Sequence, residues 1–406
     1  MSSGCATTTR TRSISLSGRG VPAGTLTPPT LTRLLGTGGK LGLTGGSMDL
    51  GGECEPRDVR MDAGRLGAAV ELVRSRKAAA QLCVVRDGRV VVDQAIGCAP
   101  DALFWLFSAS KPYVAIVIHQ LVESGRLHLD DAVAAYWPEF GEQGKRAITV
   151  RQVLQHRSGL TTIGSYVAEA RAIADWDRSL RRIERARPRW PIDTVAYSPL
   201  AFGFVLGEVA HRCGGQPIEQ LVRRGILEPL GLSNTFLGLP AGEWDRSVPI
   251  RVSGTAGPFV QSVVNRRGTR EAVVPAAGIS TTARELAALY HGLLAGGSGV
   301  LRPESLAAAV APTSEGELDR TVGAPIRWSQ GFQLGGPRFV PGVITPLGTA
   351  SSPRTFGHNG SNSCVGWADP DRRIAYAYLT NRIGRRDADV AHHAAVADKV
   401  LEAAFD

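Results

Sequence analysis

The stretch Phe104-Trp105-Leu106-Phe107-Ser108-Ala109-Ser110-Lys111-Pro112-Tyr113 decides how the rest of this chain is interpreted. It holds a Ser-x-x-Lys pair, Ser108 and Lys111, at the start of a predicted helix. Proline has no N–H to donate, so Pro112 belongs in a first helical turn, and Gly125 ends the helix. Residues three apart share one helix face, so the Ser108 hydroxyl and the Lys111 amine are expected to meet. The apolar positions that follow predict one stripe of an amphipathic helix: Val114, Ala115, Ile118, Leu121 and Val122.

This pair suits nucleophilic catalysis. A serine hydroxyl needs a base to remove its proton, and a lysine amine acts as that base only when its pKa is lowered. The positive end of the helix would also stabilise a serine alkoxide. Only five of the 46 basic residues are lysines, and an arginine cannot lose its proton in a protein. A surface Ser and Lys on a packing helix is the alternative, and the pair alone does not separate the two.

Length and composition describe a globular chain that can bury a large core. It has 406 residues, of which 43% are hydrophobic and 20% charged. Charges interrupt every apolar run within about ten residues, so no membrane span is expected. Apart from a net charge of +9, nothing points to a nucleic-acid partner. Six cysteines without a C-x-x-C pair fit reduced thiols, and we expect a cytoplasmic protein.

The first 60 residues differ from the rest of the chain. Residues 1–60 are rich in Gly, Ser and Thr, which predicts a disordered segment before a folded domain at 61–406. They lack the apolar centre of a secretion signal. A later translation start at Met48 or Met61 is an equally acceptable account of this segment, and a transit peptide is the alternative.

The order of elements predicts the fold class. A helix at 62–75 precedes strands at 81–86 and 90–96, which the turn signal Asp87-Gly88 joins into a hairpin. Helical patterns follow, and strands return near 330–335, 354–360, 363–368 and 373–380, before a last helix at 387–405. Strands joined by tight turns are antiparallel. We therefore predict an α/β (α+β) fold, an antiparallel sheet covered by helices, from about 61–105 and 275–406, with an inserted all-helical lobe at about 106–274. Ser108 opens the insertion and would lie where the lobes meet.

Tyr197 precedes a second predicted helix start. Ser198 is expected to be the N-cap and Pro199 the first helical residue of a helix that runs to about Arg212. The helix dipole would then favour a Tyr197 phenolate. A buried core tyrosine is the alternative. Thr149 and the pair Thr282-x-x-Glu285 predict two further helix starts.

Several motifs, taken in order, resemble the serine β-lactamase-like superfamily: class C β-lactamases, penicillin-binding DD-peptidases, family VIII carboxylesterases and related acyltransferases. The resemblance covers about residues 62–404 and implies the β-lactamase/transpeptidase-like fold. It is carried by Phe107–Pro112, Leu121–Asp131, Ile148–Leu160, Tyr197-Ser198, Ala276–Thr282 and Phe356–Gly360.

The resemblance implies a role for each matching residue. Ser108 is similar to the acylated nucleophile, Lys111 to its proton partner, and Tyr197 to the tyrosine that shuttles protons with the lysine. His358-Asn359-Gly360 matches the substrate-binding Lys-Thr-Gly strand. The N–H groups of Ser108 and Ser361 would form the oxyanion hole. The family base is disputed between the lysine and the tyrosine, and the sequence leaves that open.

Two departures affect the expected substrate. Pro199 replaces an asparagine that contacts the amide of β-lactams and peptides. His358 replaces a lysine that helps bind their carboxylate, and a neutral histidine binds an anion less firmly. His156 also matches a family position and is expected to be structural.

The sequence therefore predicts a serine hydrolase that cleaves a small-molecule carboxylic ester through a Ser108 acyl-enzyme, without a metal or another cofactor. A β-lactamase or D-peptidase, an acyltransferase and a non-catalytic binding protein are the alternatives. The acyl group, the leaving group and the oligomeric state are left open.

Overall fold

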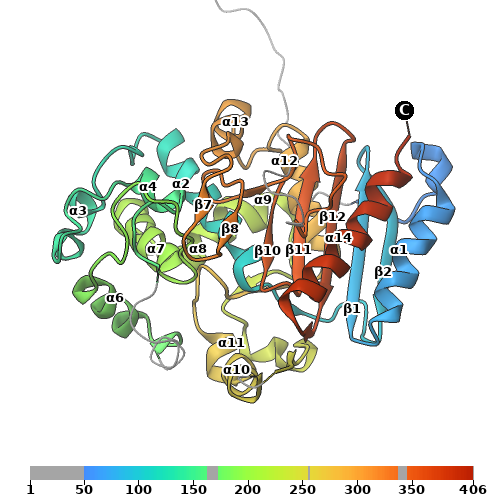
Figure 1. Ribbon diagram of the computed structural model, residues 1–406, viewed down its shortest axis with the longest axis horizontal. Coiled ribbons are helices and arrows are strands. Elements are labelled where there is room, and N and C mark those ends of the chain that lie inside the picture. Colours follow the sequence, from blue (N-terminus) through green and yellow to red (C-terminus); the bar gives the residue numbers. More distant parts are fainter. Residues whose placement is uncertain (1–49, 162–171, 255–256, 337–344, 406) are drawn as a thin grey trace, which may run out of the picture. The chain divides into compact units, whose positions relative to one another are not determined.

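An antiparallel sheet lies at the centre of the protein (Figure 1). The computed structural model describes residues 50–161, 172–254, 257–336 and 345–405. Among these residues the sheet has six strands, in the order β2-β1-β12-β11-β10-β9. Every neighbouring pair is antiparallel, as predicted.

The strands of this sheet are β1 (Ala80–Arg86), β2 (Arg89–Ile96), β9 (Gln333–Leu334), β10 (Phe356–Gly360), β11 (Cys364–Asp369) and β12 (Ile374–Thr380). Short strands elsewhere are β3 (Phe104–Trp105), β4 (Phe236–Leu237), β5 (Arg251–Val252), β6 (Ile279–Thr281), β7 (Leu318–Asp319), β8 (Ala324–Pro325) and β13 (Arg382–Ile383). The helices of the first half are α1 (Ala63–Ser75), α2 (Lys111–Glu123), α3 (Val133–Tyr136), α4 (Val150–Leu154), α6 (Trp176–Arg185) and α7 (Ala201–Gly214). Those of the second half are α8 (Ile218–Val222), α9 (Glu228–Leu230), α10 (Gly257–Val264), α11 (Arg267–Glu271), α12 (Ala283–Leu294), α13 (Pro303–Val310) and α14 (Arg386–Ala403).

The β1–β2 hairpin confirms its turn signal. Asp87 and Gly88 have φ values of 51° and 78°, as a two-residue turn with two left-handed positions requires. The expected strands and the first and last helices lie within a few residues of their predicted bounds.

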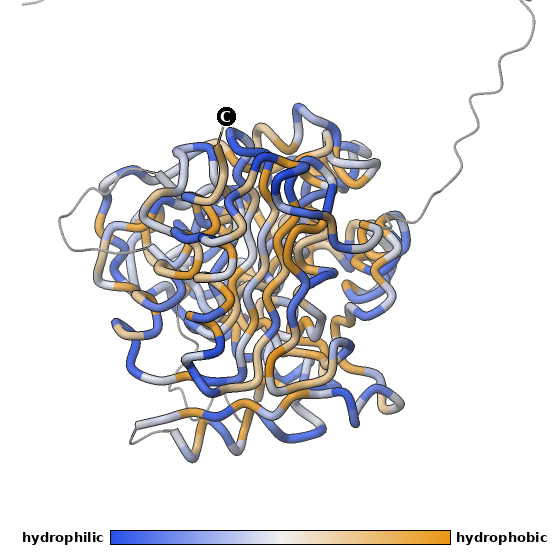
Figure 2. The backbone as a smooth tube through the Cα atoms, turned by 90° about the vertical axis from the view of Figure 1, so that its right-hand side faces the viewer, coloured by the Kyte–Doolittle hydropathy of each residue, from blue (hydrophilic) through white to orange (hydrophobic). Residues whose placement is uncertain are grey.

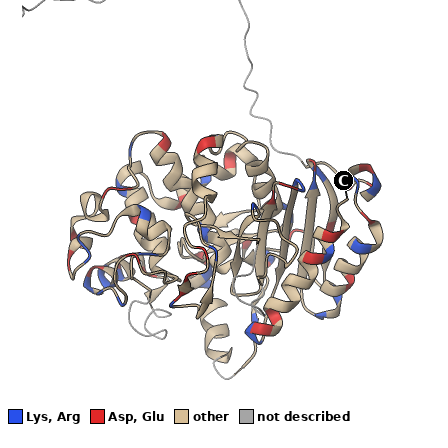
Figure 3. Cartoon of the chain, turned by 45° about the horizontal axis from the view of Figure 1, so that its top comes forward, with Lys and Arg blue, Asp and Glu red and all other residues tan. Residues whose placement is uncertain are grey.

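Side chains alternate between the two faces of the sheet, so each face has its own core. On one face, α1 and α14 lie side by side (Figure 1) and pack on one set of strand residues: Leu82, Val84, Val365, Trp367, Tyr376 and Tyr378. On the other face, α12 packs on Cys83, Val85, Cys364, Ala368, Ala375, Ala377 and Leu379. Figure 2 shows hydrophobic residues along these central strands. Figure 3 shows the charged residues mainly on outer helices and turns.

The helix that follows Ser108 differs from its prediction. The chain forms a 3-10 turn, η2, at Phe107–Ser110 and then enters α2 at Lys111. Every residue from Lys111 to His119 is buried, so α2 is not amphipathic. The amphipathic prediction was wrong because α7, α8, α13 and β10 enclose the helix. A helix that is buried all round can hold a lysine away from water.

Local capping signals are confirmed in full at α4, in part at α12, and are shifted at α7. Thr149 and Gln152 form a complete capping box at α4. At α12, the Thr282 side chain accepts from the Glu285 N–H, but the Glu285 carboxylate turns to Thr235 instead. The third helix, α7, begins at Ala201, later than predicted.

The predicted disorder of residues 1–60 falls mostly outside the described residues. Residues 50–60 are folded: Pro56–Val59 form a 3-10 turn, and the Cys54 N–H donates to the Val90 carbonyl over 2.8 Å. The expected boundary at residue 60 is therefore too late, because this segment pairs with β2. No helix in the described residues is both long and apolar enough to cross a membrane. The division into two lobes stays a prediction.

Candidate active site

A cavity of about 370 Å³ lies beside Ser108. Most of the residues singled out in the sequence line it, although they come from distant parts of the chain: Ser108, Tyr197, Pro199, His358, Asn359 and Ser361. Lys111 lies beneath them and is fully buried. The structure thus brings the predicted site residues together.

Ser108 and Lys111 meet as the Ser-x-x-Lys spacing predicted. The turn η2 carries Ser108, α2 begins with Lys111, and the Lys111 Nζ lies 3.2 Å from the Ser108 Oγ. Two backbone carbonyls also contact this nitrogen, Pro199 O at 2.8 Å and Ala276 O at 3.4 Å. Burial lowers the pKa of Lys111 well below its usual value, because the charged form loses its water.

These three contacts are compatible with either protonation state of Lys111, because an ammonium could donate one N–H to each of the three oxygens. A carbonyl oxygen accepts but cannot donate, so Pro199 and Ala276 each take one N–H of the amine. A neutral amine has two N–H groups and one lone pair. In the neutral amine the third direction, toward Ser108, is left to the lone pair, which can accept the serine O–H. The lowered pKa of Lys111 favours this neutral form, and the geometry is compatible with it.

Tyr197 stands over this pair. The Lys111 Nζ lies 4.8 Å from the centre of the Tyr197 ring. Burial raises the pKa of Tyr197, and its contact with the Ser108 side chain lowers it only in part. The phenolate prediction was therefore wrong. Since α7 begins at Ala201 and Ser198 caps the Phe202 N–H from outside the helix, desolvation outweighs the helix dipole at Tyr197.

The end of β10 packs directly against the turn that holds Ser108. A Cβ atom at Gly360 would lie 1.8 Å from the Leu106 carbonyl oxygen and 3.2 Å from the Ala109 nitrogen, so only glycine allows this approach. Ser361 follows with a left-handed φ of 49° and lines the cavity. Asn359 fixes the turn, because its Oδ1 accepts the Asn362 N–H over 3.1 Å.

His358 lies on β10 and is only 2% exposed. Its Nδ1 lies 2.8 Å from the Asn359 carbonyl oxygen, which can only accept, so Nδ1 carries the proton. Burial and the nearby Lys111 lower the pKa of His358 to about 3. This side chain is therefore neutral where the resemblance places a lysine cation.

His156 is buried behind Tyr197, with 4.7 Å between the ring centres. Its Nδ1 accepts the Ser198 N–H over 3.3 Å. It does not line the cavity, as expected of a structural residue.

Two further residues of the site carry no signal in the sequence. Trp328 stacks on Tyr197 at 5.2 Å between ring centres, and the Asp319 carboxylate bonds the Trp328 indole N–H. Both follow α13, far from any recognisable motif, and only the folded chain reveals them.

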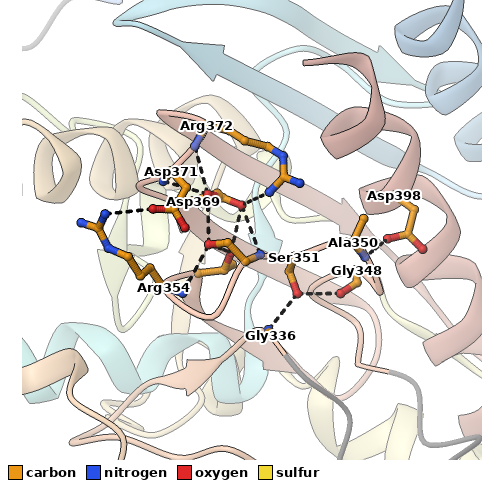
Figure 4. A network of polar contacts seen from close by, with 11 residues as sticks. Gly336, Gly348, Ala350, Ser351, Arg354, Asp369, Asp371, Arg372 and Asp398 are labelled. Atoms are coloured by element: carbon orange, nitrogen blue, oxygen red, sulfur yellow. Dashed lines mark hydrogen bonds and ion pairs between the residues drawn. The ribbon is translucent and has the colours of Figure 1, made fainter. Parts of the chain in front are cut away.

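A polar network lies next to residues that line the cavity (Figure 4). The buried Asp369 carboxylate accepts from the Thr355 hydroxyl at 3.1 Å and the Arg372 guanidinium at 2.8 Å. The Ser351 hydroxyl links this region to the Gly336 N–H, 3.3 Å away. Gly336 lines the cavity, so the network reaches this part of its lining.

Known proteins share this architecture. The chain is 28% identical to the esterase/β-lactamase LipL of Mycobacterium tuberculosis, over 74% of this chain and 76% of LipL. A penicillin-binding protein homologue from Caulobacter crescentus superposes with a TM-score of 0.71 at 28% identity, covering 84% of this chain and 98% of that one. A family VIII carboxylesterase, at 24% identity, shares the fold with a TM-score of 0.69 over 85% of this chain and 98% of its own. The family model for β-lactamases matches residues 61–400 of this chain. The chain therefore belongs to the β-lactamase family, whose members have the fold of serine β-lactamases.

Proposed function

We propose that this protein is a serine hydrolase that cleaves carboxylic esters through an acyl-enzyme on Ser108. One observation carries the proposal: a buried amine, with two carbonyl groups as acceptors, aims its third direction at the Ser108 hydroxyl. A non-catalytic binding protein has no need of a buried lysine held in this way.

The proposed reaction follows from this arrangement. The neutral Lys111 amine accepts the Ser108 proton as Oγ attacks the ester carbonyl carbon. The N–H groups of Ser108 and Ser361 stabilise the oxyanion. Tyr197 keeps its proton at neutral pH and donates it to the leaving alcohol as the C–O bond breaks. Water then attacks the acyl carbon and gives a proton to the Tyr197 phenolate, and the Lys111 ammonium returns a proton to Ser108 Oγ as the acyl–oxygen bond breaks.

Two residues favour an ester over a β-lactam or a D-peptide. Each of those substrates brings an amide and a carboxylate that lose water on entering the site. A buried polar group without a partner costs about 1–3 kcal/mol, and more when it is charged. Pro199 has no side-chain amide to offer, and His358 is neutral. A short-chain ester makes no such demand.

A second candidate function rests on a different observation. Arg386, an exposed residue of α14, lines the same cavity and donates to the Val322 carbonyl over 3.2 Å. The nearby Arg327 is already paired with Glu315 at 2.7 Å. A guanidinium at the cavity mouth favours a substrate with a carboxylate, as in a β-lactamase or D-peptidase.

Side-by-side turnover of p-nitrophenyl butyrate and nitrocefin tests the proposal. We expect a higher kcat/KM for the ester, and a higher value for nitrocefin would overturn the ester assignment. In that case Arg386→Gln should lower nitrocefin turnover and leave the ester unaffected, since only nitrocefin carries a carboxylate.

Three variants test the assigned roles. With an alkyl ester such as ethyl butyrate, Ser108→Ala, Lys111→Ala and Tyr197→Phe should each remove most activity, and their losses should not add, because the three groups act as one unit. Wild-type turnover by Ser108→Ala would refute the nucleophile. A fluorophosphonate probe should label wild type but not Ser108→Ala. Labelling without turnover of either substrate would favour an acyltransferase that needs its own acceptor.

A further inference from the structure

We propose that Asp319 is a positioning residue that sets the Tyr197 hydroxyl against Ser108, and that it acts through the Tyr197 backbone and the Trp328 ring. The inference rests on the proposed function, since it concerns the proton that Tyr197 gives to the leaving group. Asp319 does not touch the cavity, and its effect is indirect.

Asp319 ends β7 with no exposed surface. The Tyr197 N–H lies 3.1 Å from both of its carboxylate oxygens. The Trp328 indole N–H donates to Oδ2 over 2.9 Å. Two donors of the following turn, the N–H groups of Thr321 and Val322, reach Oδ1 at 2.8 Å and 2.9 Å. One buried carboxylate therefore gathers four neutral N–H donors from three parts of the chain.

The second link runs through an aromatic stack. The Trp328 and Tyr197 rings are nearly parallel, with an interplanar angle of 10° and 5.2 Å between their centres. His156 contacts both rings, at 4.7 Å from Tyr197 and 4.8 Å from Trp328. The position of Tyr197 is thus restricted in two ways: Asp319 accepts its backbone N–H, and the Trp328 ring stacks on the face of its side chain. Asp319 also accepts the hydrogen bond that orients the Trp328 indole.

A purely local role does not account for these contacts. The turn after β7 needs only the bonds from Thr321 and Val322, because a single carboxylate oxygen satisfies both. The bonds to Tyr197 and Trp328 cross to other segments and end on groups around the reacting hydroxyl. An amide in this place has one acceptor oxygen, and its NH₂ group would face N–H donors.

Comparing esters with different leaving groups tests whether Asp319 positions the Tyr197 hydroxyl. An alkyl alcohol needs a proton as it departs, whereas p-nitrophenolate leaves without one. A displaced Tyr197 hydroxyl therefore slows an alkyl ester far more than a p-nitrophenyl ester. A defect in binding or folding would lower both rates alike, so the ratio of the two separates positioning from a merely structural effect.

The test compares kcat/KM of Asp319→Asn for ethyl butyrate and for p-nitrophenyl butyrate. We expect a loss of about 10–100-fold for the ethyl ester and a much smaller loss for the aryl ester. The loss stays at or below the low end of general-acid effects, about 100–10,000-fold, because the Tyr197 hydroxyl is displaced and not removed. In a Tyr197→Phe background, Asp319→Asn should add little further loss for the ethyl ester. Glu317→Gln is the matched control: the same chemical change on the same segment, at a half-exposed carboxylate that pairs with Arg157.

If Asp319→Asn lowers kcat/KM equally for both esters, or lowers it for neither, the positioning role is wrong. If Asp319→Asn does not fold, Trp328→Phe tests the same proposal, because it keeps an aromatic ring on Tyr197 but removes the indole N–H that donates to Asp319. It should show the same selective loss for the ethyl ester, and an unselective loss overturns the proposal. A wild-type protein that cleaves neither ester would instead refute the proposed function.

Discussion

Adding one methyl group at Gly360 should separate β10 from the catalytic turn. In Gly360→Ala the new Cβ would lie 1.8 Å from the Leu106 carbonyl oxygen, whereas ordinary contacts begin at 3.4 Å. The two backbones must therefore move apart by about 1.6 Å, the difference between these distances. No flexible side chain can yield instead, because the atom that is met belongs to the backbone.

That displacement sets the expected magnitudes. Misplacing catalytic groups by about 1 Å can cost about 100-fold in rate, so kcat/KM for p-nitrophenyl butyrate should fall by about 100-fold or more. Overpacking of this kind typically lowers the free energy of unfolding by about 1–3 kcal/mol. Fluorophosphonate labelling of Ser108 should slow in parallel, since the oxyanion donors on the two backbones no longer align.

Gly67→Ala is the matched control. Gly67 lies in α1, and no atom lies within 4 Å of the position that its new methyl group would take. Alanine is favoured over glycine in a helix by about 0.5–1 kcal/mol, so this variant should gain stability and keep its activity. Urea unfolding and ester kinetics on both variants complete the assay. A Gly360→Ala protein with activity and stability close to wild type would refute the reasoning about this contact.

Two further predictions concern buried lysines. Burial lowers the pKa of Lys111, and the neutral amine is the active form. The midpoint of the rise of kcat/KM with pH should therefore lie well below 10.5, the usual pKa of a lysine. A midpoint near 10.5 would contradict the assignment. Lys145 is buried and donates to three backbone carbonyls at 2.7–2.8 Å, so Lys145→Met should lower the free energy of unfolding by about 2–4 kcal/mol with little effect on ester turnover. An unchanged urea midpoint would argue against that role.

Signals that act over a few residues predicted their part of the fold correctly. The Asp87-Gly88 turn fixed the first hairpin, and the Thr149 cap fixed the start of α4. The spacing of Ser108 and Lys111 predicted their contact, because a helical turn brings residues three apart onto one face. Each of these features depends on neighbouring residues alone.

Burial was the main source of error. Periodicity predicted an exposed side for α2, but the surrounding elements enclose it from Lys111 to His119. The same desolvation keeps Tyr197 protonated, although its position before a helix suggested the opposite. Dielectric environment is set by everything that packs around a group, and a sequence pattern contains only part of it.

The sequence by itself determined the family motifs, the antiparallel sheet and the pair that begins the site. Only the tertiary structure decided what that pair can do. The carbonyls that hold the Lys111 amine belong to Pro199 and Ala276, 88 and 165 residues further along the chain. The carboxylate that holds Tyr197 comes from Asp319, 122 residues away. Hydrogen bonds between such distant segments form only after the sheet and helices have packed, so no local pattern encodes them.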